Sequence, residues 1–132
     1  LIFVRWVLVV VNFERAMYQD PEQDLNALWW DLVERYQLVP RPEGRDAPDW
    51  AAKIHLALYP VYYQNYLLGE LMASQLSRTI AGRHVRLVDN PEAGQFLVNE
   101  LFRRGALADW DTTLEQVTGE RLTTRYFAED FV

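Results

Sequence analysis

The spacing of apolar residues predicts helices along most of the chain. Residues 2 to about 18 are apolar on every side at first and become amphipathic toward their end, as in a helix that emerges from a core. The next segment, which runs to about Gln37, repeats apolar residues at helical spacing and so predicts one broad buried face. That face holds Leu25, Leu28, Trp29, Leu32, Val33 and Tyr36. Core packing is the expected role of Trp29 and its neighbour Trp30.

Capping and turn residues predict where these helices begin and end. In Asp20-Pro21-Glu22-Gln23, Asp20 can cap a helix, Pro21 suits the first helical position and Gln23 completes a capping box. Residues 39 to 48 are rich in proline and charge and predict a surface loop. Residues 49 to 59 predict irregular structure or a single helical turn.

The second half of the chain follows the same pattern. Pro60 is expected to open a helix that continues to about Ala81 and stops near Gly82. Further helices are expected from residue 91 to about 104, from 109 to 119 with Trp110, Leu114 and Val117 inward, and from 123 or 124 onward. Period-two alternation never extends beyond four or five residues, and residues 84 to 88 come nearest to it. The expected fold is therefore all-α, with about five to six helices.

Composition limits the class of protein. With 132 residues, half of them hydrophobic, the chain suits one compact domain or part of a larger one and is not disordered. A net charge of −6 argues against nucleic acid as a partner, because phosphate binding needs clustered Lys and Arg. The absence of cysteine excludes disulfides and thiolate metal sites. A cytoplasmic location is expected, and a cysteine-free exported protein stays an alternative.

The apolar start of the chain does not predict a membrane segment. Its first eleven residues are fewer than the roughly 20 needed to span a bilayer, Arg5 interrupts them, and no cleavage site marks a signal peptide. A helix that is apolar all round is normally buried among other helices. We therefore expect residues outside this chain, or a second copy in a homo-oligomer, to cover it. This interpretation makes residues 1–132 the C-terminal portion of a larger protein.

Residues 53 to 66 concentrate groups that can do chemistry. The stretch holds Lys53, His55 and four of the seven tyrosines. Tyr62 and Tyr63 lie four and three residues before Tyr66, so either shares a helix face with it near the positive end of the helix dipole. A phenol there can donate to a carbonyl oxygen that becomes an oxyanion. An interface or the edge of a core is the alternative reading of such a tyrosine-rich helix start.

The order of several motifs resembles a known class of enzyme. Trp29-Trp30-Asp31-Leu32 with Tyr36-Gln37, then Ala52-Lys53-Ile54-His55, then Pro60 with Tyr63-Gln64-Asn65-Tyr66, is similar to the C-terminal part of the angiotensin-converting-enzyme-type peptidyl-dipeptidases. Tyr63 to Glu70 is also similar to the thimet-oligopeptidase and oligoendopeptidase F families. Ala93-Gly94, Leu101, Trp110 and Leu114 follow the first family as well. The resemblance covers nearly all of the chain.

The resemblance implies a part in zinc-dependent peptide hydrolysis. By position, Tyr66 would donate to the oxyanion, and His55 would hydrogen-bond the backbone of the peptide substrate. Lys53 and Tyr63 would hold the C-terminal carboxylate of the substrate. The spacing after His55 is one residue longer than in the converting-enzyme type, so Tyr62 is the alternative to Tyr63. The position tied to chloride in the animal enzymes is Asn65 here, which argues against chloride activation.

The metal-binding half of such a site is missing from the sequence. There is no His-Glu-x-x-His motif among the 132 residues, and the chain has only two histidines. His84 has no carboxylate or histidine at ligand spacing and is expected on the surface. We therefore expect no metal site in this chain and no hydrolysis by the chain alone. Zinc would come from an N-terminal zinc-binding part of the same protein.

Two functional hypotheses follow. In the first, residues 1–132 form a helical C-terminal subdomain of a zinc peptidase fold, from a peptidyl-dipeptidase or an oligopeptidase. In the second, the chain is a non-enzymatic helical protein-interaction domain whose tyrosines and apolar first helix form a binding surface.

Overall fold

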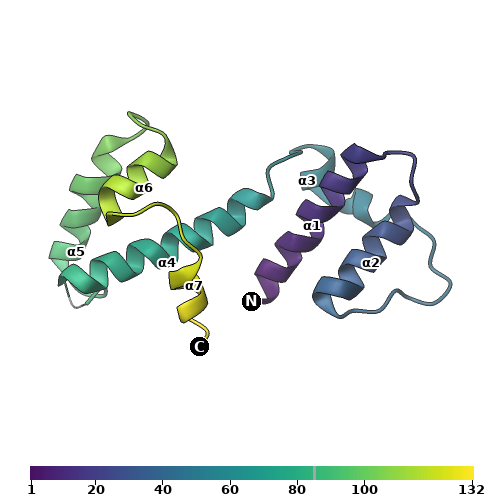
Figure 1. Ribbon diagram of the computed structural model, residues 1–132, viewed down its shortest axis with the longest axis horizontal. Helices are drawn as coiled ribbons and strands as arrows, with labels where there is room; N and C mark the ends of the chain where they lie inside the picture. Colours follow the sequence, from purple (N-terminus) through teal and green to yellow (C-terminus); the bar gives the residue numbers. More distant parts are fainter. Residues whose placement is uncertain (85) are drawn as a thin grey trace. The chain divides into compact units, whose positions relative to one another are not determined.

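A computed structural model describes residues 1–84 and 86–132, with the side chain of His84 also outside the described part. The surface position expected of His84 therefore falls outside the described residues. The described residues form seven α-helices and no strand (Figure 1), so the all-α class is confirmed. The count exceeds the expected five or six because short turns of four and five residues count as helices. The chain divides into two compact units, Leu1–Leu67 and Leu68–Val132.

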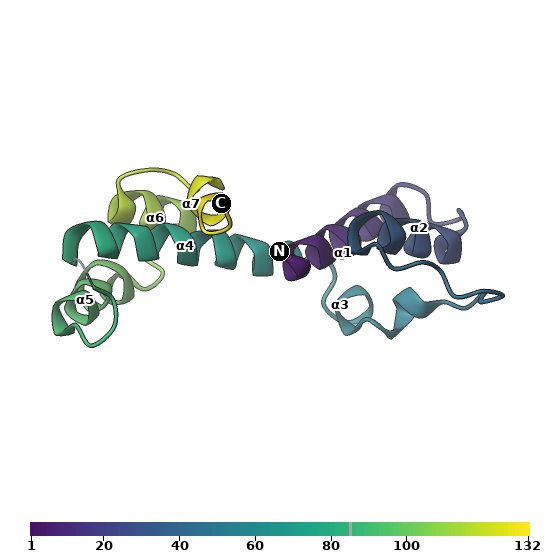
Figure 2. The same cartoon turned by 90° about the horizontal axis from the view of Figure 1, so that it is seen from below.

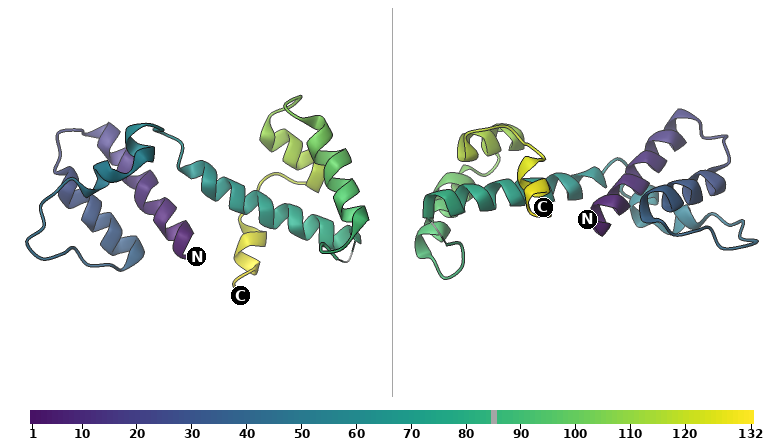
Figure 3. Two further views of the ribbon diagram at one scale, coloured as in Figure 1. Left: turned by 180° about the vertical axis from the view of Figure 1, so that it is seen from behind. Right: turned by 60° about the horizontal axis from the view of Figure 1, so that its bottom comes forward.

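The first unit is built on two long helices that lie side by side, α1 (Ile2–Gln19) and α2 (Leu25–Gln37) (Figures 1 and 3). The predicted face of α2 packs into the core, with Trp29 and Val33 buried. The rings of Trp6 and Phe13 meet Trp29 edge-on, with centroids 5.6 Å and 5.2 Å away. Such edge-to-face contacts stabilise aromatic cores beyond the area they bury.

The middle of α1 is covered by residues of this chain. Val7, Val9, Val10 and Phe13 are all buried within the first unit. The expectation that residues outside the chain cover α1 is therefore wrong for its middle, because α2 and the following turns pack against it. At its N-terminal end, the side chains of residues 1 to 3 stay exposed.

The predicted start of α2 is also wrong. The helix begins at Leu25, and Asp24 caps it by accepting a hydrogen bond from the Ala27 N–H at 2.9 Å. Gln23 turns back instead and donates to the carbonyl oxygens of Ala16 at 2.8 Å and Asp20 at 2.6 Å. A glutamine that satisfies the last carbonyls of α1 is not available for a capping box on α2.

The loop of residues 39–48 lies on the surface, as expected, and two single turns follow it where irregular structure or one turn is predicted. They are a 3₁₀ turn at Asp49–Ala52 and the short helix α3 (Ile54–Ala57). Figure 2 shows both on one side of the α1–α2 pair. Indole hydrogen bonds hold the 3₁₀ turn there, from Trp30 to Asp49 at 3.1 Å and from Trp50 to Asn26 at 3.2 Å.

Helix α4 (Gln64–His84) starts four residues later than Pro60, where it was predicted. Residues 58–63 form turns instead, and Val61 has a φ of 55°, in the left-handed region that a helix cannot contain. The Val61 N–H donates to the buried carboxylate of Glu14, and Gln64 donates to the Val61 carbonyl at 2.8 Å. The helix also continues two residues past Gly82.

The second unit surrounds the rest of α4. A helical run covers residues 91 to 104, as predicted, but only α5 (Pro91–Phe96) is regular; a π-helical turn (Leu97–Leu101) and a 3₁₀ turn (Phe102–Arg104) complete it. Helix α6 (Trp110–Thr118) ends at Gly119 with φ 88°, also as predicted, and α7 is Arg125–Glu129.

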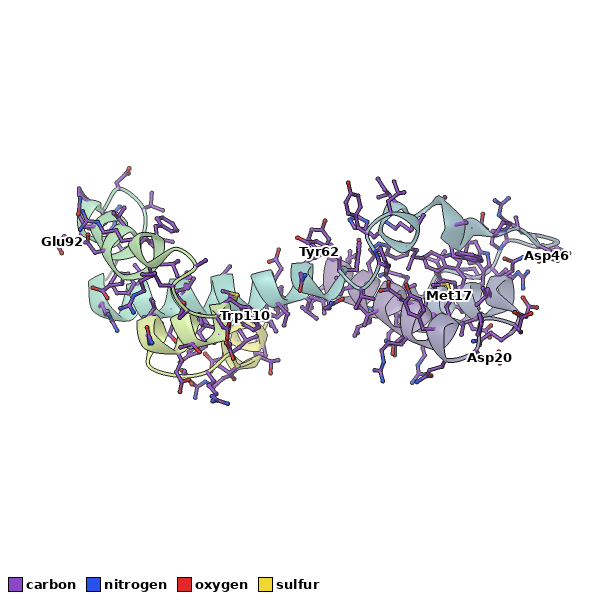
Figure 4. The ribbon with its side chains drawn as sticks, turned by 90° about the horizontal axis from the view of Figure 1, so that it is seen from above. Met17, Asp20, Asp46, Tyr62, Glu92 and Trp110 are labelled. Carbon is purple, nitrogen blue, oxygen red and sulfur yellow. The ribbon has the colours of Figure 1, made fainter. Side chains whose placement is uncertain are left out.

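One inward position in this unit is wrong. Leu114 and Val117 are buried, but Trp110 is 49% exposed because it starts α6 beyond the edge of the core. Figure 4 labels its side chain. The core itself combines Ile80 of α4 with Ala93, Phe96 and Val117. Across the described residues, no helix is both long and apolar enough to cross a membrane.

Candidate functional site

Four aromatic side chains from the α3–α4 region line one pocket of about 360 Å³ in the first unit. His55 comes from α3, Tyr59 and Tyr62 from the turn, and Tyr66 from the first turn of α4. We call these four residues the aromatic pocket. Figure 4 labels Tyr62, whose side chain stands clear of the ribbon. Three of the five predicted site residues therefore meet at one place.

Buried groups hold the turn that carries these side chains. Leu56 fixes α3 to the core and Tyr63 fixes the turn, since both are buried. Glu14, 5% exposed, accepts a hydrogen bond from the Val61 N–H. This contact joins α1 to the turn and keeps Val61 in its left-handed conformation, which is costly for a β-branched residue.

His55 and Tyr66 are joined by a hydrogen bond. The Nε2 atom of His55 lies 3.0 Å from the hydroxyl oxygen of Tyr66, and the two rings are nearly perpendicular at 85°. The other ring nitrogen of His55, Nδ1, is buried and has no hydrogen-bond partner among the described residues. Phe3 of α1 meets the Tyr66 ring edge-on, with centroids 6.3 Å apart. Tyr66 is 41% exposed, so its hydroxyl remains accessible to a ligand.

Lys53 and Tyr63 pair with each other and do not line the pocket. The Lys53 Nζ lies 4.8 Å from the centroid of the Trp6 ring and 5.6 Å from that of Tyr63. Both distances are typical of cation–π contacts. Tyr63 is 6% exposed, whereas Tyr62 is 48% exposed and lines the pocket. Of the two alternatives for a carboxylate binder, Tyr62 is the one open to a ligand.

The hydroxyl of Tyr63 is held in its neutral form. Burial raises the pKa of Tyr63 above its ordinary value, a hydrogen bond with the Trp6 indole opposes this, and the nearby Tyr66 adds to it. A neutral phenol can donate a hydrogen bond at physiological pH. It is not a nucleophile or a base there.

Sequence reasoning missed three residues that shape this site. Tyr59 lines the pocket four residues after His55, a spacing that could have identified it. Phe3 and Trp6 contact the same cluster from α1. No local signal joins α1 to residues 53–66, because that contact depends on tertiary packing.

The described residues do not offer a zinc site. No group of three histidine, aspartate or glutamate side chains is close enough to hold a metal ion in residues 1–83 and 86–132, whose side chains are described. Within the aromatic pocket, His55 is the only residue of a type that binds zinc. The residues present therefore do not fit a catalytic zinc.

A second pocket lies in the other unit. It has a volume of about 580 Å³ between the end of the 91–104 run and the start of α6, with Phe102 and Trp110 in its wall. Asp109 is its only charged lining residue. Its apolar lining includes no pair of groups suited to acid–base or nucleophilic chemistry.

Comparisons of the chain with protein-family models, with curated proteins and with solved structures found no match.

Proposed function

We propose that this chain is the C-terminal portion of a zinc-dependent peptidase, either a peptidyl-dipeptidase or an oligopeptidase. It contributes residues that bind the peptide and stabilise the transition state, and it is inactive alone. The observation that carries the proposal is the hydrogen bond between His55 and an accessible Tyr66, 3.0 Å long, at the wall of an open pocket.

This hydrogen bond suits an oxyanion donor. Tyr66 can donate its proton to a ligand only if its oxygen accepts from His55, so Nε2 must carry the imidazole proton. Nδ1 is then an unprotonated acceptor in a buried place. In this tautomer the Tyr66 O–H points away from His55 and is free for a carbonyl oxygen that gains negative charge.

His55 acts on the substrate through Tyr66 in this arrangement. Its Nε2 atom is already engaged by the Tyr66 hydroxyl, and its Nδ1 atom is buried. We therefore propose His55 as a positioning residue for Tyr66. The substrate carboxylate would meet Tyr62 first, because Tyr63 is buried and the Lys53 ammonium lies over two aromatic rings.

The test removes one oxygen atom, the Tyr66 hydroxyl, from the full-length protein and measures the rate of peptide hydrolysis. Tyr66→Phe keeps the ring and its packing but removes the donor, so we expect kcat to fall about 100- to 1,000-fold with little change in KM. Tyr59→Phe is the matched control, because Tyr59 lines the same pocket and has no assigned part in the reaction. Equal rates for Tyr66→Phe and the unaltered protein would remove the basis of the proposal.

The isolated chain gives a second readout of the same proposal. It is expected to hold far less than one zinc ion per chain, because its residues do not fit a zinc site, and to cleave no peptide. Zinc bound near one per chain together with peptidase activity would contradict the assignment of the metal to another part of the protein.

A helical protein-interaction domain is the second candidate. It is favoured by the exposed apolar side chains at the start of α1, where Leu1, Ile2 and Phe3 are 63%, 79% and 41% exposed. In that case Tyr66→Phe would leave any peptidase activity of the full-length protein unchanged. Replacing Ile2 and Phe3 by serine would instead weaken self-association or partner binding.

A further inference from the structure

We propose that the aromatic pocket of His55, Tyr59, Tyr62 and Tyr66 binds a methylated ammonium ion, in the manner of an aromatic cage. The inference concerns the chain itself and does not rest on the proposed peptidase function. It follows from the wholly aromatic lining of the pocket, from the lack of a charged lining residue and from the ammonium group of Lys53 that neighbouring rings already hold.

The aromatic rings that line the pocket contact one another at steep angles. Tyr66 is nearly perpendicular to both Tyr62 and His55, at 84° and 85°, with centroids 5.7 Å and 5.5 Å away. Tyr59 is tilted by 50° to His55, at 6.5 Å. All four residues that line the pocket carry aromatic rings, so a bound group meets aromatic surface wherever it contacts these residues. An ammonium group within about 6 Å of several ring faces is attracted by each of them.

The pocket lining carries no fixed charge that would repel a cation. None of the four lining residues is a lysine or an arginine, and the whole chain carries a net charge of −6. No lining residue is a carboxylate either. A methylated ammonium ion has few or no N–H groups that need an anionic partner, so a lining of aromatic rings without a carboxylate suits it.

The same aromatic cluster already holds one ammonium group. The Lys53 Nζ lies over the ring of Tyr63, which meets both His55 and Tyr66 edge-to-face with centroids 4.8 Å and 5.2 Å away. The covered side of the cluster thus binds a cation supplied by the chain. The aromatic pocket is the part of this cluster that is open to solvent, and its volume of about 360 Å³ suits a small organic cation.

The probe is choline, measured against its neutral carbon isostere 3,3-dimethylbutan-1-ol. The two have the same shape, so the difference in affinity isolates the charge. We expect choline to bind about tenfold more tightly, from the usual strength of a desolvated cation–π contact. Its methyl protons should shift upfield in NMR titrations, because they lie over ring faces. Equal affinity of the two ligands, or no binding of choline, would overturn the proposal.

Variants locate the site. Tyr62→Leu and Tyr66→Leu each remove a ring face and should weaken choline at least severalfold, while Tyr62→Phe keeps the face and should bind almost as the unaltered chain does. Tyr18→Leu is the matched control, because Tyr18 is 58% exposed on α1 and does not line the pocket. Circular dichroism verifies that each variant is folded. Binding of choline that survives both leucine substitutions would place the ligand elsewhere and refute the assignment.

A further experiment distinguishes a lipid headgroup from a free small molecule as the natural carrier of the ammonium group. If the natural ligand is a lipid headgroup, the chain should co-sediment with phosphatidylcholine vesicles and free choline should release it. If the ligand is a free small molecule, choline should bind without co-sedimentation. Either result supports the methylated ammonium as the recognised group.

Discussion

Gln75 on α4 is a polar side chain with no exposed surface, and its amide bonds to four groups of the segment 118–123. The amide nitrogen donates to the Thr118 hydroxyl at 2.9 Å and to the carbonyls of Glu120 and Arg121 at 3.1 Å and 3.3 Å. The amide oxygen accepts from the Thr123 N–H at 3.1 Å. One side chain thus satisfies an irregular segment that has no regular backbone partner.

Replacing Gln75 by alanine should lower the free energy of unfolding by about 2–4 kcal/mol. The loss combines unpaired buried groups, at about 1–3 kcal/mol, with the cavity left by the side chain. Gln95→Ala is the matched control, because Gln95 is exposed on α5. Urea unfolding followed by circular dichroism measures both. Equal stability of the two variants would show that Gln75 does not hold the 118–123 segment.

For single residues, the sequence predicts which side chains belong to the candidate site better than it predicts which side chains pack together. Residue type and spacing mark residues 53–66 as a candidate site, and His55, Tyr62 and Tyr66 of that stretch do line one pocket. Gln75 gave no signal, since a polar residue within a helix is normally exposed. The position of the Lys53 ammonium depends on Trp6, a residue 47 positions away in sequence whose contact no local pattern encodes.

Helices α6 and α2 both end with a residue in the left-handed conformation, but only one of the two residues suits that conformation. Gly119 ends α6 in the left-handed region, where glycine carries no steric cost. Leu38 ends α2 in the same region, with φ 59° and ψ 31°, and its N–H donates to the Glu34 carbonyl at 3.0 Å. The backbone therefore makes the same cap with an unsuitable side chain.

Leu38→Gly should raise the free energy of unfolding by about 1 kcal/mol, because glycine removes the steric cost of a left-handed leucine. Leu38 is 70% exposed, so little burial is lost. Val39→Gly is the adjacent control: Val39 is also exposed and has a negative φ, so it should be neutral or destabilising. Thermal unfolding compares the two. A fall in melting temperature for Leu38→Gly would contradict this account of the cap.

Three proline-led helix starts show what local sequence can and cannot determine. Asn90-Pro91 does start a helix, and the Asn90 side chain accepts from the Glu92 N–H at 3.0 Å. Pro21 and Pro60 do not start theirs. At Pro21 the capping glutamine serves the preceding helix, and after Pro60 the Glu14 carboxylate holds Val61 in a turn. Both competing contacts come from α1, so the local pattern could not reveal them.

On the scale of the whole molecule, the chain contains two cores with different membership. The first gathers residues of α1, α2, α3 and the turn before α4, and the second gathers α4, α5 and α6. The boundary falls after Leu67, inside α4. Periodicity predicted the buried face of α2 and most of that of α6, but not which partner covers either. The assignment of residues 1–132 to one portion of a catalytic domain stays a prediction.

Because the two cores are separate, we expect a substitution in one core to destabilise that unit and not the other. Phe13 and Leu114 are fully buried, one in each unit, so replacing either with alanine should cost about 2–5 kcal/mol of local stability. Hydrogen exchange read by mass spectrometry resolves the effect. In Phe13→Ala the amides of α2 should exchange faster while those of α6 keep their rates, and in Leu114→Ala the reverse should hold. Because each variant serves as the other's control, a loss of stability that spreads equally to both units would mean that the chain unfolds as one cooperative body.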